Sequence, residues 1–339
     1  MAHIVGIDLG TTNSLVAYMA DGRPRVIPDR HDRTMVPSVV AMTDNGLIVG
    51  DPAKEHLTRN PERTVYSVKR FMGKSLEDVQ GELAYFPYHL TEQGGVIRIK
   101  LGEKTYSPPQ ISAMILKELK QRAEAHLGES ISKAVITVPA YFNDSQRQAT
   151  KDAGMIAGLD VLRIINEPTA ASLAYGLQQK TQGTIAVYDL GGGTFDISIL
   201  KLKSGIFEVL ATNGDTHLGG DDFDRQIANL FVKEISEQHG LDLNAYPDHM
   251  QAVRLEAERA KIRLSDELKT TAILDLPESK GRYSRDLTRD QLESFTMELV
   301  ERTLGPCRLA LNDDPAVRVC RQSFDRDNQT LNRRDGESF

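Results

Sequence analysis

Residues 4–12 read IVGIDLGTT, and residues 185–194 read IAVYDLGGGT. In each stretch an apolar, strand-like run ends at Asp-Leu-Gly and leads into a Gly/Thr-rich turn, after which a second apolar run begins. The copies are too far apart for a solenoid repeat, and their separation suits two duplicated domains. The alternative is a chance likeness between two hairpins, since hairpin turns often contain glycine.

The rest of the chain alternates between strand-like and helical patterns. The first hairpin predicts strands at 4–9 and 14–19, and further strands are expected at 134–138, 161–165, 184–189, 196–202, 206–212 and 270–276. Helices are expected at about 109–126, from Asn143-Asp144 to Gly154 and Gly158, at 167–176, and at about 221–238, 248–265 and 289–304. This order predicts an α/β chain in which antiparallel hairpins feed mixed sheets.

Composition narrows the classes of protein that are possible. The 339 residues suggest about two domains, and the net charge of −7 argues against nucleic acid as the main partner. No apolar run reaches the ~18 residues of a membrane span, and residues 1–4 lack a secretory pattern, so a cytoplasmic protein is expected. The two cysteines, Cys307 and Cys320, form neither a disulfide framework nor a CxxC zinc pair.

The two turns suggest phosphate binding. A Gly-rich turn presents backbone N–H groups without obstruction by side chains, and Thr11, Thr12 and Thr194 add hydroxyl groups. Carboxylates at the strand ends, Asp8 and Asp189, would face phosphates only if a cation lay between them. Mg²⁺ suits this place because it keeps several waters and takes few protein carboxylates.

The sequence does not match other common nucleotide-binding and hydrolase motifs. Residues 68–75 end like a P-loop, but Val68 stands where glycine is required. The turn at 191–196 begins like a dinucleotide fingerprint, but Asp196 stands at its third glycine. The sequence contains no HExxH or GxSxG, so a zinc protease and an α/β-hydrolase lack support.

Taken together, the motifs resemble the seventy-kilodalton heat-shock chaperones, the DnaK family. The blocks that carry the resemblance are residues 6–14, 135–144, 166–171, 187–196 and 218–224, and the likeness runs from about residue 3 to about 311. The resemblance implies an α/β, two-lobed, actin-like ATPase fold, with residues 1–180 as the first lobe and 181–311 as an incomplete second lobe. Residues 312–339 are expected to be an atypical tail, and no segment resembles the client-binding domain.

The resemblance also implies roles for individual residues. ATP or ADP would be bound by the phosphate turns, by a glycine pair and by one face of a helix: Gly10, Thr11, Thr12 and Asn13; Gly191, Gly192, Gly193 and Thr194; Gly219 and Gly220; and Glu258, Lys261 and Ser265. Catalysis would depend on Lys69, Glu167, Thr194 and Asp196. Asp8 and Asp189 would hold Mg²⁺ through water, and Pro139 and Arg147 would relay the nucleotide state.

These expectations leave simpler interpretations open. Lys69 could be a solvated surface lysine, Glu167 a first-turn acid favoured by the helix dipole, and the helix face at 258–265 a solvated charged face.

The expected function is that of an ATPase that serves in protein folding or in iron–sulfur protein assembly. The second role is included because residues 67–75 and 194–200 are also similar to the iron–sulfur-cluster assembly chaperones. Expected partners are a J-domain co-chaperone and a nucleotide exchange factor, with unfolded or iron–sulfur scaffold proteins as clients if a client domain exists. The alternatives are a small-molecule kinase of the same superfold and a catalytically weak fragment that binds partners.

Overall fold

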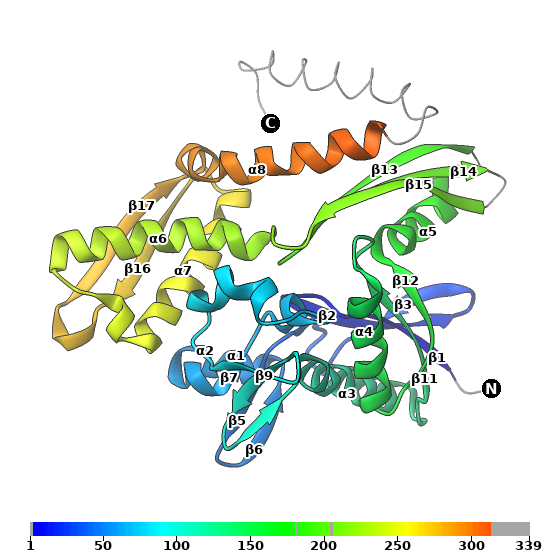
Figure 1. Ribbon diagram of the computed structural model, residues 1–339, viewed down its shortest axis with the longest axis horizontal. Helices are drawn as coiled ribbons and strands as arrows, with labels where there is room; N and C mark the ends of the chain where they lie inside the picture. Colours follow the sequence, from blue (N-terminus) through cyan, green and yellow to red (C-terminus); the bar gives the residue numbers. More distant parts are fainter. Residues whose placement is uncertain (1–2, 180–181, 204–205, 313–339) are drawn as a thin grey trace.

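The computed structural model describes residues 3–179, 182–203 and 206–312. They form a mixed α/β protein with several separate sheets (Figure 1). In the N-terminal half the elements are β1 Ile4–Asp8, β2 Asn13–Ala20, β3 Arg23–Val26, β4 Val36–Pro37, β5 Val40–Thr43, β6 Gly46–Val49, α1 Asp51–Lys54, α2 His56–Arg59, η1 Pro61–Arg63, β7 Thr64–Val65, η2 Val68–Phe71, η3 Glu77–Tyr85, β8 Leu90–Gln93, β9 Val96–Leu101, β10 Lys104–Tyr106, α3 Pro108–Leu127, β11 Lys133–Val138, α4 Asp144–Ile156, β12 Asp160–Asn166 and α5 Glu167–Gln179. In the C-terminal half they are β13 Gln182–Leu190, β14 Phe195–Lys203, β15 Ile206–Asp215, α6 Gly220–His239, η4 Leu243–Ala245, α7 Pro247–Asp266, β16 Lys269–Asp275, η5 Pro277–Ser279, β17 Arg282–Thr288 and α8 Arg289–Asn312.

Both Asp-Leu-Gly copies form antiparallel hairpins. In the first, β1 pairs with β2, and Asp8 lies opposite Leu15. In the second, β13 pairs with β14, and Asp189 lies opposite Asp196. Strand β1 is also paired in parallel with β11, in a sheet of order β12–β11–β1–β2–β3, whereas the described part of the second sheet has the order β13–β14–β15. The strands predicted around both motifs are therefore confirmed.

Apolar residues at alternate positions place β1 at the centre of a core. Val5 and Ile7 are buried on one face of the strand, as a period of two requires, and Leu9 is buried directly after its end. This core contains residues from 5 to 161. Two other cores come from the C-terminal half, one formed by α6, α7, β16 and β17 and the other by β14, β15 and α8.

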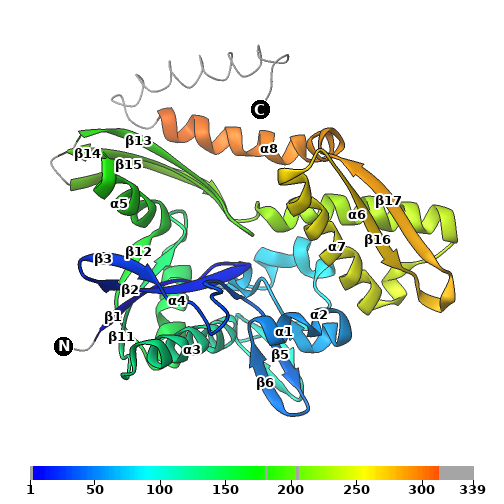
Figure 2. The same cartoon turned by 180° about the vertical axis from the view of Figure 1, so that it is seen from behind.

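Helix α5 lies between the β1-containing sheet and the sheet β13–β14–β15, as Figures 1 and 2 show from opposite sides. Helix α8 covers the other face of β14 and β15. Helix α5 therefore contacts strands of both halves of the chain.

Helix α4 begins directly after Asn143, where the sequence predicts a helix to start. The Gln146 N–H donates to the Asn143 side chain at 3.0 Å, and the Asn143 N–H donates to the Gln146 side chain at 3.1 Å, which is a capping box. Gly158, with φ 77°, ends the helix in a left-handed conformation. Gly154 is not a stop signal as expected. It lies inside α4, where a Cβ atom would clash with Val161 and lie 3.2 Å from Ile136 Cδ1.

The predicted ends of two helices are wrong, and one strand was missed. Helix α5 continues through Gly176 to Gln179, and α8 continues past Leu304 across Pro306 to Asn312. The extension of α8 is stabilised by packing, because Cys307, Ala310 and Leu311 are buried against β14. Strand β17 was not predicted, since its buried residues are only Tyr283 and Leu287 in a polar stretch. The tail at 313–339 and the lobe boundary at 180–181 lie outside the described residues.

Candidate functional site

The second Gly-rich turn is fixed by its own backbone and by the start of α6. The Gly191 N–H donates to the Thr194 carbonyl at 2.9 Å, which closes the turn. The N–H groups of Gly220 and Asp221 donate to the carbonyls of Gly191 and Gly192 at 2.9 and 2.8 Å. These hydrogen bonds fix the conformation of the turn against the N-terminus of α6, where a helix presents partial positive charge.

The first Gly-rich turn is fixed by two serine side chains. Ser14 Oγ accepts from the Gly10 N–H at 3.2 Å, and Ser38 Oγ donates to the Gly10 carbonyl at 2.8 Å. The Ser38 N–H donates to the Thr12 carbonyl at 2.8 Å. Sequence reasoning named residues 10–13 but not Ser14 or Ser38 as their support.

The two turns lie against each other. A Cβ atom on Gly192 would clash with Thr12 Oγ1, and one on Gly193 would lie 2.9 Å from Thr11 Cγ2. A Cβ atom on Gly219 would clash with Gly193. Gly219 is therefore required by the close approach of the Gly192-Gly193 backbone, whereas Gly192 and Gly193 make room for side chains of the first turn and of Arg70.

Beside the turns, a buried lysine is paired with a glutamate. Lys69 Nζ lies 2.8 Å from Glu167 Oε1, and the Lys69 side chain is only 7% exposed. The interpretation of Lys69 as a solvated surface residue is therefore wrong. Burial disfavours the charged ammonium, but Glu167, Asp8 and Asp196 outweigh this and raise the pKa of Lys69.

Four carboxylates gather around this lysine. Asp8 accepts a hydrogen bond from Thr137 Oγ1 at 3.1 Å. Burial raises the pKa of Glu167 to about 7, with Asp8 and Asp189 acting in the same direction. Burial also raises the pKa of Asp189, reinforced by Asp8, and raises that of Asp196 to about 6. The four carboxylates thus outnumber the two described cations that lie near them, Lys69 and Arg147.

Such a cluster fits a divalent cation bound beside phosphate. Among the described residues no group of three or more His, Cys, Asp or Glu side chains is placed to bind a metal directly. Asp8 and Asp189 at the ends of β1 and β13 could hold Mg²⁺ through its waters. Burial and the neighbouring Asp8 raise the pKa of Asp189, and a cation bound beside it would favour its ionised form.

Asp196 connects the cluster to the loop at 139–142. The Tyr141 N–H donates to Asp196 Oδ1 at 2.8 Å. Arg147 holds this loop by donating to the carbonyls of Ala140 and Phe142, each at 3.0 Å, and it also donates to Asn166 Oδ1 at 2.8 Å. The Phe142 N–H donates to the Pro139 carbonyl at 3.2 Å. Pro139 and Arg147 are thus connected to the acid cluster through one loop.

The three residues predicted on α7 are placed differently from one another. Glu258 lines a small pocket together with Thr11 and Thr12. Lys261 Nζ lies 2.8 Å from Asp224 Oδ1 and donates to the Gly220 carbonyl at 3.0 Å. Ser265 is exposed, and its Oγ donates to the Lys261 carbonyl at 3.4 Å. The structure therefore brings Glu258 and Lys261 to the turns, with Ser265 one helical turn further away.

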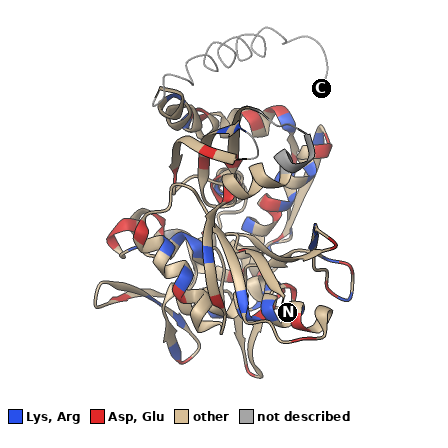
Figure 3. Cartoon of the chain, turned by 90° about the vertical axis from the view of Figure 1, so that its right-hand side faces the viewer, with Lys and Arg blue, Asp and Glu red and all other residues tan. Residues whose placement is uncertain are grey.

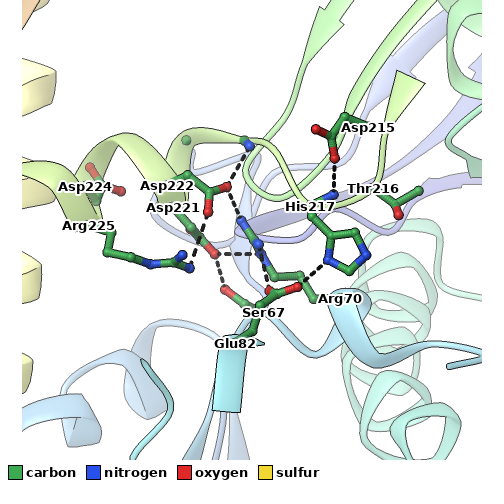
Figure 4. A network of polar contacts seen from close by, with 12 residues as sticks. Ser67, Arg70, Glu82, Asp215, Thr216, His217, Asp221, Asp222, Asp224 and Arg225 are labelled. Atoms are coloured by element: carbon green, nitrogen blue, oxygen red, sulfur yellow. Dashed lines mark hydrogen bonds and ion pairs between the residues drawn. The ribbon is translucent and has the colours of Figure 1, made fainter. Parts of the chain in front are cut away.

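Sequence reasoning missed a charged network that joins the two halves (Figure 4). At its centre Arg70, from η2, lies between Glu82 of η3 and Asp221 and Asp222 of α6. The available signal was that Lys69 and Arg70 stand between the apolar residues Val68 and Phe71, because charges that are drawn into a core are buried only when they are paired.

Charges elsewhere are mixed. In the view of Figure 3, basic and acidic residues are interspersed along the elements, in keeping with a net charge of −7. None of the helices in the described parts of the chain is long and apolar enough to cross a membrane.

Ionisation of the buried Asp196 carboxylate is expected to lower the stability of the folded protein. We expect Asp196→Asn to stabilise the protein, without nucleotide or metal, by about 1–3 kcal/mol at pH 8 and by almost nothing at pH 4. The pKa of Asp196 is about 6 in the folded chain, against 3.8 as its ordinary value. Its contribution to stability is therefore present below pH 3.8 and is lost as the pH rises through 6. The Asn variant keeps an acceptor for the Tyr141 N–H but escapes that loss.

Thermal unfolding of both proteins from pH 4 to pH 8 measures this difference. An equal shift in Tm at the two ends of the range would show that ionisation of Asp196 is not its cause.

A family model described as Hsp70 protein matches residues 4–317. The match covers most of the chain and includes every site residue described above.

Proposed function

The chain belongs to the Hsp70 family, and from this premise we propose that it binds ATP with Mg²⁺ and hydrolyses the terminal phosphate bond. Family membership implies an actin-like ATPase fold and a chaperone-type activity. The observation that supports hydrolysis in this chain is the buried Lys69–Glu167 pair, set among Asp8, Asp189 and Asp196 and beside two Gly-rich turns.

In this proposal the two halves of the chain are the two lobes of the fold, and the site lies between them. The N–H groups of residues 10–13 and 191–194 bind phosphate oxygens, and the hydroxyl groups of Thr11, Thr12 and Thr194 assist them. Glu258 and Lys261 lie on the side where the nucleoside would bind. Mg²⁺, when bound, neutralises charge on the phosphate oxygens.

In the proposed reaction, one group of the chain stabilises charge and two others accept a proton. The Lys69 ammonium, oriented by Glu167 at 2.8 Å, stabilises negative charge that develops on the transferred phosphate. Glu167 and Asp196 have pKa values near 7 and 6, so either carboxylate can accept a proton from the attacking water at neutral pH.

The test is release of inorganic phosphate from ATP by the purified chain, with and without Mg²⁺. Steady hydrolysis that requires Mg²⁺ and no other substrate would support the proposal. ADP release only after addition of a sugar or a carboxylic acid would identify a small-molecule kinase of the same superfold instead. Nucleotide binding without turnover would leave a partner-binding role.

The partners that follow from the proposal are a J-domain co-chaperone and a nucleotide exchange factor, with protein clients reached through a separate peptide-binding domain. The choice between general folding and iron–sulfur protein assembly can be tested with two J-domain proteins, one from each system. The cognate J-domain protein should stimulate hydrolysis at lower concentration.

A further inference from the structure

Arg70 is a deeply buried charge at the junction of the two halves. Its side chain is 1% exposed. Nη1 lies 2.9 Å from Glu82 Oε2, within the N-terminal half, and Nη2 lies 2.7 Å from Asp222 Oδ2, in the C-terminal half. Nε lies 3.5 Å from Asp221 Oδ2. One guanidinium therefore bridges both halves, a geometry that its planar fork permits and a lysine does not.

The same side chain supports the second phosphate turn. A Cβ atom on Gly193 would lie 2.8 Å from Arg70 Nε and 3.1 Å from Arg70 Cγ. Asp222 Oδ2 accepts from Arg70 and also from the Gly219 N–H at 2.8 Å. Gly219 in turn packs against Gly192 and Gly193. Arg70 thus contacts the turn directly and also holds the segment behind it.

Arg70 is the next residue in the chain after Lys69. Both residues belong to the short η2 helix, which begins after Ser67 in a left-handed conformation with φ 51°. Ser67 Oγ donates to Asp221 Oδ2 at 2.6 Å. Consequently η2 is attached at two places to the start of α6, while Lys69 points to Glu167.

We propose that Arg70 is a positioning residue, which sets the Lys69 ammonium in register with the Gly191–Thr194 turn when the two halves are closed on nucleotide. This inference rests on the proposed ATPase function. Arg70 pairs with acids behind the turn and packs against Gly193 within it, so its effect on the phosphate is transmitted through Gly193 and through the neighbouring Lys69. Small displacements of a group in an active site reduce the rate more than the affinity, because the transition state demands the stricter geometry.

The test compares Arg70→Gln with Arg225→Gln. Arg225 also pairs with Asp222, at 3.3 Å, and stacks on Tyr85 of the N-terminal half, with its guanidinium carbon 3.7 Å from the ring centre. It is 23% exposed, and the contacts to Gly193 are made by Arg70. We expect Arg70→Gln to slow single-turnover hydrolysis by about 10²-fold with less than about threefold change in ATP affinity. Arg225→Gln should stay within about threefold of the wild type in both.

A double-mutant cycle with Asp222→Asn separates positioning from general stability. If Arg70 acts through Asp222, Asp222→Asn should also slow hydrolysis, and the double variant should be little slower than the slower single variant. Asp222→Asn also serves as the test if Arg70→Gln does not fold. Arg70→Lys should not restore the rate, since one ammonium cannot span Glu82 and Asp222.

Three outcomes would overturn the inference: wild-type turnover in Arg70→Gln, equal losses of rate and affinity, or equal effects of Arg70→Gln and Arg225→Gln. Absence of turnover in the wild-type chain would instead contradict the proposed function. The wild-type measurement thus distinguishes the two failures.

Discussion

Lys69→Met is expected to slow ATP hydrolysis by about 10²–10³-fold while changing the dissociation constant for ATP by less than about threefold. Lys69 Nζ is buried and held 2.8 Å from Glu167, so it is preorganised before charge develops on the phosphate. An interaction that strengthens in the transition state contributes to the rate and little to ground-state binding. Single-turnover rates and calorimetric titration with ATP measure the two quantities separately.

The variant also leaves Glu167 without its cation, which requires a control. Burial already raises the pKa of Glu167, and loss of Lys69 should raise it further. The double variant Lys69→Met/Glu167→Gln removes this buried acid, so it should recover Tm without recovering the rate. Lys104→Met, on the exposed strand β10, controls for the loss of a positive charge. Equal losses in rate and affinity would make Lys69 a simple binding residue.

The sequence predicted the elements that local patterns determine. The apolar run at 4–9 and the helix start near Asn143-Asp144 depend on a few neighbouring residues, and both appear in the structure as expected. The extension of α8 across Pro306 could not be predicted in this way. Its cause is burial of Cys307, Ala310 and Leu311 against β14, and such tertiary packing overrides a local helix-breaking residue.

The candidate site shows the same division. The turns at 10–13 and 191–194 and the acids Asp8 and Asp189 stand in recognisable motifs, so their residue types indicated a phosphate site. The supports do not stand in such motifs. Ser38 is 28 residues from Gly10, whose carbonyl it binds, and Asp222 is 152 residues from Arg70. Partners at these separations are brought together only by the fold.

The second large effect concerns the metal. We expect Asp8→Asn and Asp189→Asn each to raise the Mg²⁺ concentration needed for half-maximal ATP hydrolysis by roughly 10–100-fold, the range seen when groups that orient a metal's ligands are removed. Both acids stand at strand ends beside the Gly-rich turns, and the waters of a hydrated Mg²⁺ there would donate hydrogen bonds to the two carboxylates. Mg²⁺ titrations of the hydrolysis rate at saturating ATP measure the shift.

Loss of folding cannot account for the expected shift. Asn at position 8 can still accept from Thr137 Oγ1, as Asp8 does at 3.1 Å. Burial and the neighbouring Asp8 raise the pKa of Asp189, so its neutral replacement relieves repulsion in the metal-free protein and should not lower Tm at pH 8. Asp44→Asn, at an acid whose side chain is 95% exposed, controls for the change in net charge. Unchanged Mg²⁺ titrations in both site variants would place the metal elsewhere, whereas an unchanged Tm with a shifted titration would locate it between the two strand ends.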